Sequence, residues 1–377
     1  MKSEGKRILY VGNDADYFLS HRLPLAKAAQ SSGYDVHVAT PDGSGVERIV
    51  GEGFTFHPIL LNRMGISPFQ EIKSLLDIYK LYRELQPALV HHVTIKPVLY
   101  GGMMARLAGI PAVVSTVSGL GYVFISRGFK AKLGRSIVKF LYRLALGHDN
   151  NVVIFQNPDD KNLFLGSGMI TKGRVALIKG SGVDLRAFAP MAEPGAIPLI
   201  ILASRMLWDK GVGEFVEAAR LLQNAGIKAR FALVGDTDPG NPAAVPTSQL
   251  EDWKRDGVVE WWGRRDDMPN VFAQAHVVCL PSYREGLPKV LIEAAACGRP
   301  IITTDVPGCR EVVRDGENGL LVPIRDAVAL ATALRKLIED PELRRRMGKK
   351  GRELAVTEFS VETVVNESLG IYRELIS

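Results

Sequence analysis

Two glutamates in the segment SYREGLPKVLIEAAACG could either break a bond together or hold a ligand. Glu285 and Glu293 have seven residues between them. Carboxyl pairs that hydrolyse glycosidic bonds stand about 5 to 9.5 Å apart, whereas eight residues of helix span about 12 Å. The spacing argues against a hydrolytic pair and favours ligand binding, with two solvated glutamates on a helix surface as the alternative.

The same segment predicts an anion site. The apolar run HVVCLPS indicates a strand and YREGL a loop, and a helix follows with Pro288 as its first residue and Gly298 just past its end. Free amides and the positive dipole end at such a helix start bind anions such as a diphosphate. Glu293 lies about 7.5 Å further along the helix, where it could accept hydrogen bonds from ribose hydroxyls.

A second candidate loop carries two cations. In LIILASRMLWDKGVGEF, a predicted strand is followed by Arg205 and Lys210 and then by Gly211 before a helix. Arginine offers a planar fork and lysine a point charge, and the two together suit a diphosphate. Either residue alone would more often be a solvated side chain, but the coincidence with the helix start favours a binding site.

The elements that must position these loops alternate along the chain. Short apolar runs such as RILYVG, DVHVAT and ALVHHV alternate with helical stretches, and the rhythm restarts at LIILAS. This is the pattern of α/β doubly wound parallel sheets. We expect two Rossmann-like domains, 1–185 and 186–359, with the Ala, Pro and Gly-rich segment 187–198 as linker. Residues 360–377 have helical spacing and could pack on either domain.

Two such domains would place their strand-to-helix loops in one cleft, because ligands bind beyond the carboxyl ends of parallel strands. The chain has 377 residues, 46% of them hydrophobic, and a formal net charge of +6. Three cysteines without CxxC spacing predict neither a disulfide framework nor a zinc site. We also expect no signal peptide and no membrane-spanning segment.

Two DxD triplets, Asp14 to Asp16 and Asp236 to Asp238, raise the question of a metal. Two carboxylates in a turn are common in proteins. We therefore predict no metal and no other cofactor. The chain also has no GxGxxG or Walker motif.

The segments SRMLWDKGVGEF and SYREGLPKVLIEAAACGRPIITTDVPGCREVV resemble the retaining glycosyltransferases of family 4, which have the GT-B fold of two Rossmann-like domains. The resemblance extends over essentially the whole chain. Within that family it is strongest to the bacterial N-acetylgalactosaminyltransferases that extend a sugar linked to diphospho-undecaprenol, through the same segments and SGLGYVF.

The resemblance implies roles for residues of the second half. Glu285 would contact hydroxyls of the donor sugar, Glu293 would hold the ribose, and Arg205 and Lys210 would hold the diphosphate. The segment WWGRRDD would bring backbone beside the base. Sugar and phosphate would face the backbone amides of Gly286, Leu287, Pro288, Lys289 and Val290. The base would lie near Arg264 and Arg265.

In the first half, the resemblance places Gly12, after the first strand, near the donor phosphate. A histidine near the end of ALVHHV would hydrogen-bond the donor sugar, and we select His92 over His91 because alternation would leave one of the two facing a core. A histidine satisfied by packing is the alternative. Lys96 could reach the acceptor or the donor phosphate, and the loop containing Gly119 and Gly121 would lie towards the acceptor.

Residues 127–146 combine basic and apolar side chains. No acidic residue occurs there before Asp149, and apolar residues recur at helical spacing. A core helix with a solvated basic face is one interpretation, and a contact with an anionic membrane surface is the other. Nucleic acid is less favoured, because no aromatic-interleaved platform or known binding motif accompanies the charges.

We therefore expect a metal-independent retaining glycosyltransferase that moves a hexose or N-acetylhexosamine from a UDP-sugar to a polyprenyl-diphosphate-linked saccharide. It would work in the cytoplasm, peripherally at the inner face of the plasma membrane. Two alternatives stay open: a GDP-mannose or UDP-glucose dependent transferase with a soluble acceptor, and a catalytically silent subunit that binds a nucleotide sugar.

Overall fold

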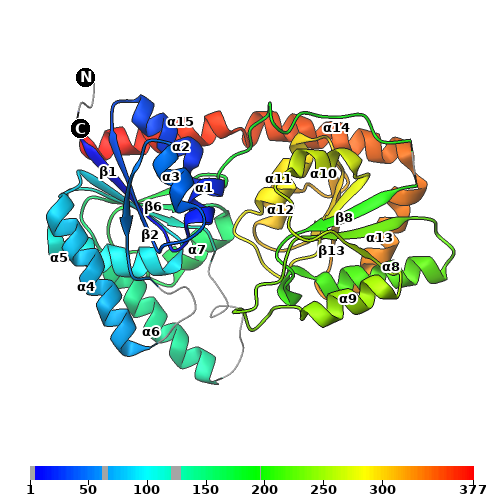
Figure 1. Cartoon of the computed structure of the whole chain (residues 1–377), viewed down its shortest axis with the longest axis horizontal. Helices are drawn as coiled ribbons and strands as arrows, with labels where there is room; N and C mark the ends of the chain where they lie inside the picture. The colour runs from blue at the N-terminus through cyan, green and yellow to red at the C-terminus, as the bar shows by residue number, and fades with distance from the viewer. Residues whose placement is uncertain (1–4, 62–66, 120–128, 196) are drawn as a thin grey trace. The chain divides into compact units, whose positions relative to one another are not determined.

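The computed structural model describes residues 5–61, 67–119, 129–195 and 197–377. They form two compact units, Met1–Ser181 with Glu362–Ser377, and Gly182–Val361. In each unit a parallel sheet lies between two layers of helices (Figure 1). The α/β doubly wound fold predicted for both halves is confirmed.

The first unit contains a seven-stranded parallel sheet with the order β3-β2-β1-β4-β5-β6-β7. Chain order runs outward in one direction from β1 and in the other from β4, so the point of reversal lies between these two neighbours. The strands are β1 (Arg7–Val11), β2 (Asp35–Thr40), β3 (Thr55–Pro58), β4 (Leu89–Val93), β5 (Val113–Val117), β6 (Asn151–Phe155) and β7 (Arg174–Leu177).

Helices cover both faces of this sheet. The core on one face takes side chains from α1 (Ala15–His21), α2 (Leu23–Ser31), α3 (Val46–Gly51) and α15 (Val361–Ile376). The opposite face is covered by α4 (Pro68–Leu85), the π-helical turn η1 (Pro97–Gly101), α5 (Gly102–Ala108), α6 (Phe129–Ala145) and α7 (Pro158–Gly166). Within the described residues, no helix is both long and apolar enough to cross a bilayer.

The C-terminal helix α15 completes the core of the first unit. Val364, Leu369 and Tyr372 recur at helical spacing and are buried against the sheet. The hydroxyl of Tyr372 also hydrogen-bonds His91 and Tyr10, which lie on neighbouring strands. These contacts explain why the last helix packs on the unit that begins the chain.

The second unit contains a six-stranded parallel sheet with the order β10-β9-β8-β11-β12-β13, which reverses between β8 and β11. The strands are β8 (Leu199–Ala203), β9 (Arg230–Val234), β10 (Glu260–Trp261), β11 (Val277–Leu280), β12 (Ile301–Thr304) and β13 (Gly319–Val322). The helical segments are η3 (Trp208–Lys210), α8 (Val212–Asn224), α9 (Thr247–Arg255), α10 (Met268–Gln274), α11 (Lys289–Ala296), α12 (Cys309–Val312), α13 (Ala327–Glu339) and α14 (Pro341–Glu358).

The central strands are continuous apolar runs because both faces of each sheet are covered. Every residue of β8 and of β11 is buried, as expected for parallel strands between helical layers. The core on one face comes from α8, α9 and α13, and the core on the other from α10, α11 and α12, with α14 contributing to both.

The segment expected to be a linker is bound to the second unit over its described part. Arg352 donates to the carbonyls of Leu185 and Phe188, and Arg299 donates to that of Ala192. Arg344, which is buried, pairs with the carboxylate of Glu193. The lack of hydrophobic periodicity in this segment therefore indicates an extended chain, which arginines hold against the second unit.

Candidate functional site

The candidate donor loops meet where the second sheet reverses its order. Because β8 and β11 are hydrogen-bonded neighbours, the loops that leave their carboxyl ends lie side by side. One loop carries Arg205 and Lys210, and the other carries Ser282 and Glu285. This is the position at which open parallel sheets bind ligands.

An ion pair joins the two loops. Lys210 Nζ lies 2.5 Å from Glu285 Oε1, and the two side chains are 18% and 12% exposed. The same carboxylate oxygen accepts a hydrogen bond of 2.7 Å from the Ser282 hydroxyl. Glu285 is therefore held in one orientation from both loops, as a site for a specific ligand requires.

Two glycines allow this close approach. Gly211 has φ +73°, and a Cβ there would overlap the carbonyl oxygen of Pro281 in the opposite loop. Gly308 has φ +82°, and a Cβ there would lie 2.7 Å from the carbonyl oxygen of Glu285. Only glycine accepts both the left-handed backbone and the contact.

Helix α11 begins beside Glu285. Pro288 is its N-cap and makes no side-chain capping bond, and the helix starts at Lys289, one residue later than predicted. Leu287 is buried and Val290 half-buried. The resemblance implied that the amides from Gly286 to Val290 face the ligand. Pro288 has no amide hydrogen, so it cannot donate to a ligand. It sets the start of the helix instead.

Glu293 is buried on α11, one turn beyond Lys289. Burial raises the pKa of its carboxyl group, and Lys289 opposes that rise. The Lys289 ammonium lies 2.7 Å from Glu293 Oε1. A buried carboxylate with a single cation beside it has acceptor capacity left for hydroxyl donors.

Arg205 is the most accessible of the predicted catalytic side chains. It is 47% exposed, and its Nη1 lies 2.6 Å from Asp238 Oδ2. Asp236 accepts a hydrogen bond of 3.0 Å from the Arg264 amide. The second DxD triplet thus orients an arginine and a loop of its own unit.

Arg265 donates two hydrogen bonds of 2.7 Å to Asp267. These bonds lower the pKa of Asp267 to about 2 and raise that of Arg265. The loop in front of Arg265 turns at Gly263, which has φ +65°. Side chains of this loop therefore hold in place the backbone that is predicted to lie beside the base.

Further predicted residues of the first unit follow β1 and β5 in the sequence. Gly12 follows β1, where its amide donates to the Ala39 carbonyl at 3.0 Å and a Cβ would find ordinary contacts. The Gly12 amide is therefore already engaged in a hydrogen bond within the sheet. Gly119 has φ +146° after β5, and Gly121 lies outside the described residues.

The two histidines of β4 are both buried, in different helical layers. His91 bonds Tyr372 and Thr116, while His92 Nε2 bonds the Tyr82 hydroxyl at 2.7 Å under η1. Alternation predicts one core histidine and one facing outward, and this is wrong because helices cover both faces of the sheet. His92 has no exposed surface, and burial lowers its pKa to about 3.

Lys96 lies in the loop after β4 and is held by a carboxylate. Its Nζ is 2.7 Å from Glu71 Oε1 of α4, and both side chains are largely buried. The ammonium also lies 5.9 Å from the centre of the Tyr100 ring. Burial, reinforced by a hydrogen bond with Glu71, raises the pKa of Tyr100. No sequence signal linked Glu71 to Lys96.

Backbone strain occurs in the same loop. Thr94 has φ +76°, and its buried hydroxyl has no hydrogen-bond partner among the residues that the structure describes. A β-branched residue in this region costs about 1 to 3 kcal/mol, and such residues gather at functional sites. The first DxD triplet follows Gly12 at the end of β1, and there Asp14 caps α1 and Asp16 accepts from Ser44.

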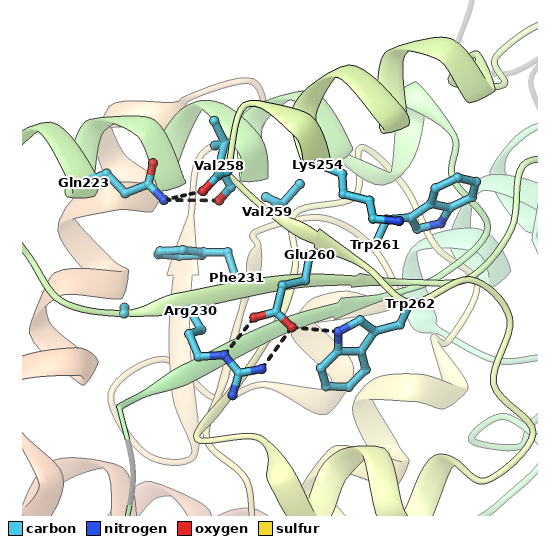
Figure 2. A pocket seen from close by; sticks show the side chains of 11 residues that line it. Gln223, Arg230, Phe231, Lys254, Val258, Val259, Glu260, Trp261 and Trp262 are labelled. Carbon is cyan, nitrogen blue, oxygen red and sulfur yellow. Dashed lines mark hydrogen bonds and ion pairs between the residues drawn. The ribbon is translucent and has the colours of Figure 1, made fainter.

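Two hollows of the second unit lie away from these loops. One, of about 430 Å³, lies at the outer edge of the sheet, where Arg230 pairs with Glu260 (Figure 2). The other, of about 770 Å³, adjoins the carboxyl ends of α11 and α13. Within the part of the chain that the structure describes, no group of three or more His, Cys, Asp or Glu residues could hold a metal ion.

Comparisons with known proteins agree with this fold. Residues 197–340 match the family described as "Glycosyl transferases group 1", and residues 7–157 match "Glycosyl transferase 4-like". Over 380 residues the chain is 28% identical to N,N'-diacetylbacillosaminyl-diphospho-undecaprenol alpha-1,3-N-acetylgalactosaminyltransferase of Campylobacter jejuni, covering 95% of this chain and 98% of the relative.

A second relative is UDP-Gal:alpha-D-GlcNAc-diphosphoundecaprenol alpha-1,3-galactosyltransferase of Escherichia coli, 28% identical over 82% of this chain and 81% of its own. Among solved structures, Anabaena HepE in complex with UDP and glucose aligns with a TM-score of 0.77 at 18% identity, covering 98% of this chain and 99% of its own. This likeness confirms the GT-B fold.

Proposed function

Because the chain belongs to the group 1 and 4-like glycosyltransferases of the GT-B fold, we propose that it is a metal-independent retaining enzyme that uses a UDP-sugar. It transfers a hexose or N-acetylhexosamine to a polyprenyl-diphosphate-linked saccharide. One observation carries the proposal: the Lys210 and Glu285 pair lies beside an uncapped helix start, with Glu293 one turn further along.

The diphosphate would bind Arg205, Lys210 and the start of α11. Preorganised donors of this kind stabilise the charge that develops on a leaving group and are usually the largest contribution to catalysis. Lys210 and Glu285 neutralise each other before the donor binds. When it binds, Lys210 turns to the phosphate and Glu285 accepts from a hydroxyl of the transferred sugar.

The other half of the donor would lie along α11 and the Arg265 loop. Glu293 accepts from the ribose hydroxyls, and its burial strengthens those hydrogen bonds because competing water is excluded. Amides of Gly286, Leu287, Lys289 and Val290 face sugar and phosphate, and the backbone near Arg265 contacts the base.

No carboxylate serves as the nucleophile in this proposal. Glu285 is engaged by Lys210 and Ser282. The leaving phosphate accepts the proton of the acceptor hydroxyl while that hydroxyl attacks the same face of the sugar, so the configuration at the reacting carbon is retained.

The first unit would serve the acceptor side. Lys96, Gly119 and Gly121 are assigned to the acceptor and His92 to the donor sugar. Gly12 is assigned to close backbone approach of the donor phosphate, because its amide already bonds the Ala39 carbonyl. Neutral His92 can hydrogen-bond a hydroxyl without a charge, but its burial means that η1 has to shift before it reaches a ligand.

The lipid-linked acceptor is supported by the relatives, whose names specify diphospho-undecaprenol-linked sugars. UDP is supported by the ligand of the HepE structure. The basic helix within 127–146 would bind the anionic membrane surface, which places the enzyme peripherally at the inner face of the plasma membrane.

The proposal is tested by offering radiolabelled UDP-sugars, and GDP-mannose as the alternative, to lipid extracts and to free sugars. We expect label from a UDP-sugar in the lipid fraction. Transfer only from GDP-mannose, or only to free sugars, would replace the proposal by the soluble-acceptor alternative. UDP binding without transfer or slow donor hydrolysis would indicate a silent subunit.

A further inference from the structure

Exposed apolar side chains of the first unit gather on one helical layer. Helices α4, α5 and α6 lie on one side of the sheet (Figure 1), and α4 and α6 both contact η1. On the other face, Val50 of α3 is the one large apolar side chain that is exposed in the described helices. In the α4 to α6 layer they are Phe69, Ile72, Leu76, Leu107, Ile137, Phe140 and Leu144.

The first two turns of α4 carry an apolar stripe. Phe69, Ile72 and Leu76 are 86%, 56% and 54% exposed. At helical spacing these three positions fall within about 60° of one another around the helix axis. Lys73 and Lys80 are exposed in the same sector. Apolar side chains flanked by lysines are typical of helices that lie in a membrane interface.

The acidic side chains of this part of α4 turn away from the stripe. Glu71 binds Lys96 at 2.7 Å, and Asp77 accepts from the Leu60 amide at 2.8 Å. Each carboxylate has a partner inside the unit, so the outward face keeps a positive charge. An anionic surface is complementary to such a face.

Helix α6 repeats the pattern. Ile137, Phe140 and Leu144 have the same spacing as the stripe on α4 and are 55%, 61% and 38% exposed. Lys139 and Arg143 are exposed beside them. Two helices of one layer therefore present the same combination of apolar and basic side chains.

We propose that α4 is a second membrane-contacting helix, and that α4 and α6 together seat the first unit on an anionic bilayer. This deepens the membrane contact proposed above for residues 127–146. A second copy of the chain fits less well, because a two-fold contact through this face would bring Lys73 and Lys80 against like charges.

Vesicle flotation tests the proposal with the full chain. Vesicles of equal parts phosphatidylethanolamine and phosphatidylglycerol are compared with phosphatidylcholine vesicles. We expect the Phe69→Ser, Ile72→Ser, Leu76→Ser triple variant to lower binding to the anionic vesicles by about tenfold or more. Lys73→Gln and Lys80→Gln should each lower it by about fivefold, and only on anionic vesicles.

The matched control is the triple variant Ile324→Ser, Val328→Ser, Val356→Ser, which removes three exposed apolar side chains of the other unit. It should float like the wild type. Circular dichroism and UDP binding establish that both triple variants are folded. The proposal is overturned if the α4 variant floats like the wild type, or if the wild type does not bind anionic vesicles.

Sedimentation without lipid tests whether a second copy of the chain, rather than a bilayer, contacts the α4 stripe. If the wild type dimerises and the α4 variant is monomeric, the stripe is a contact between two copies and the proposal fails. Transfer to a short-chain lipid acceptor in detergent separates the two proposals. Vesicle binding without any transfer would support the α4 contact and contradict the proposed acceptor. Transfer without vesicle binding would support the acceptor and contradict the α4 contact.

Discussion

Both units reverse their strand order between two central strands, and the loops at the two reversal points differ in chemistry. In the second unit, Lys210 and Glu285 lie beside an uncapped helix start. In the first unit, a neutral His92, a strained Thr94 and the Lys96 to Glu71 pair occupy the equivalent place. One topology thus carries two different sets of side chains, for which we propose a diphosphate site in the second unit and a site for hydroxyl groups in the first.

The largest expected effect is at the reversal point of the second unit. Lys210→Ala removes a cation from the leaving diphosphate and should lower kcat about 100- to 1000-fold, with Arg205→Ala also strongly reduced. Steady-state transfer assays measure both. Lys254→Ala, an exposed lysine on α9 of the same unit, is the control and should retain activity. Near-normal turnover in Lys210→Ala and Arg205→Ala would remove both residues from the mechanism.

A smaller effect is expected at the reversal point of the first unit. Lys96→Met should raise the acceptor KM about tenfold, because one charge-assisted hydrogen bond is lost, while UDP affinity stays unchanged. Glu71→Gln, which keeps the shape but releases Lys96, should show a milder change of the same kind. A weaker affinity for UDP in Lys96→Met would instead assign Lys96 to the donor phosphate.

Glu293 should show a conflict between stability and binding. Its folded pKa is raised by burial, so the free energy of unfolding should fall as pH rises from its ordinary pKa through the raised one. Glu293→Gln removes that dependence and should stabilise the protein at neutral pH by about 1 kcal/mol, while weakening UDP binding. Denaturant unfolding across this pH range measures it, and an unchanged pH dependence would contradict the raised pKa.

The smallest effect is expected from His92. Because burial lowers its pKa to about 3, the imidazole should stay neutral between about pH 5 and pH 8. The pH profile of kcat should therefore be the same in the wild type and in His92→Asn. An inflection near pH 6.5 that disappears in the variant would show that His92 becomes charged during the reaction.

The candidate donor loops could be located from sequence because their signals are local. Pro288 and Gly298 punctuate α11 in the sequence itself, and the buried runs of β8 and β11 are continuous. The edge strands β3 and β7 gave no such signal, because their end residues are exposed and their middle residues only half-buried.

The partners of the site residues could not be predicted. Asp238 reaches Arg205 across 33 positions, and Glu71 reaches Lys96 across 25. Such pairs depend on how strands are ordered in the sheet, which no local pattern reveals. The two buried histidines of β4 show the same limit, because alternation assigns opposite faces without showing that helices cover both.

The assignment of the diphosphate to the second unit is tested most directly by calorimetric titration of UDP into the full chain. Lys210→Ala and Lys96→Met are compared with the wild type, with circular dichroism to establish folding. We predict that UDP affinity falls at least about tenfold in Lys210→Ala and is unchanged in Lys96→Met. Unchanged affinity in Lys210→Ala, or an equal loss in both variants, would contradict it.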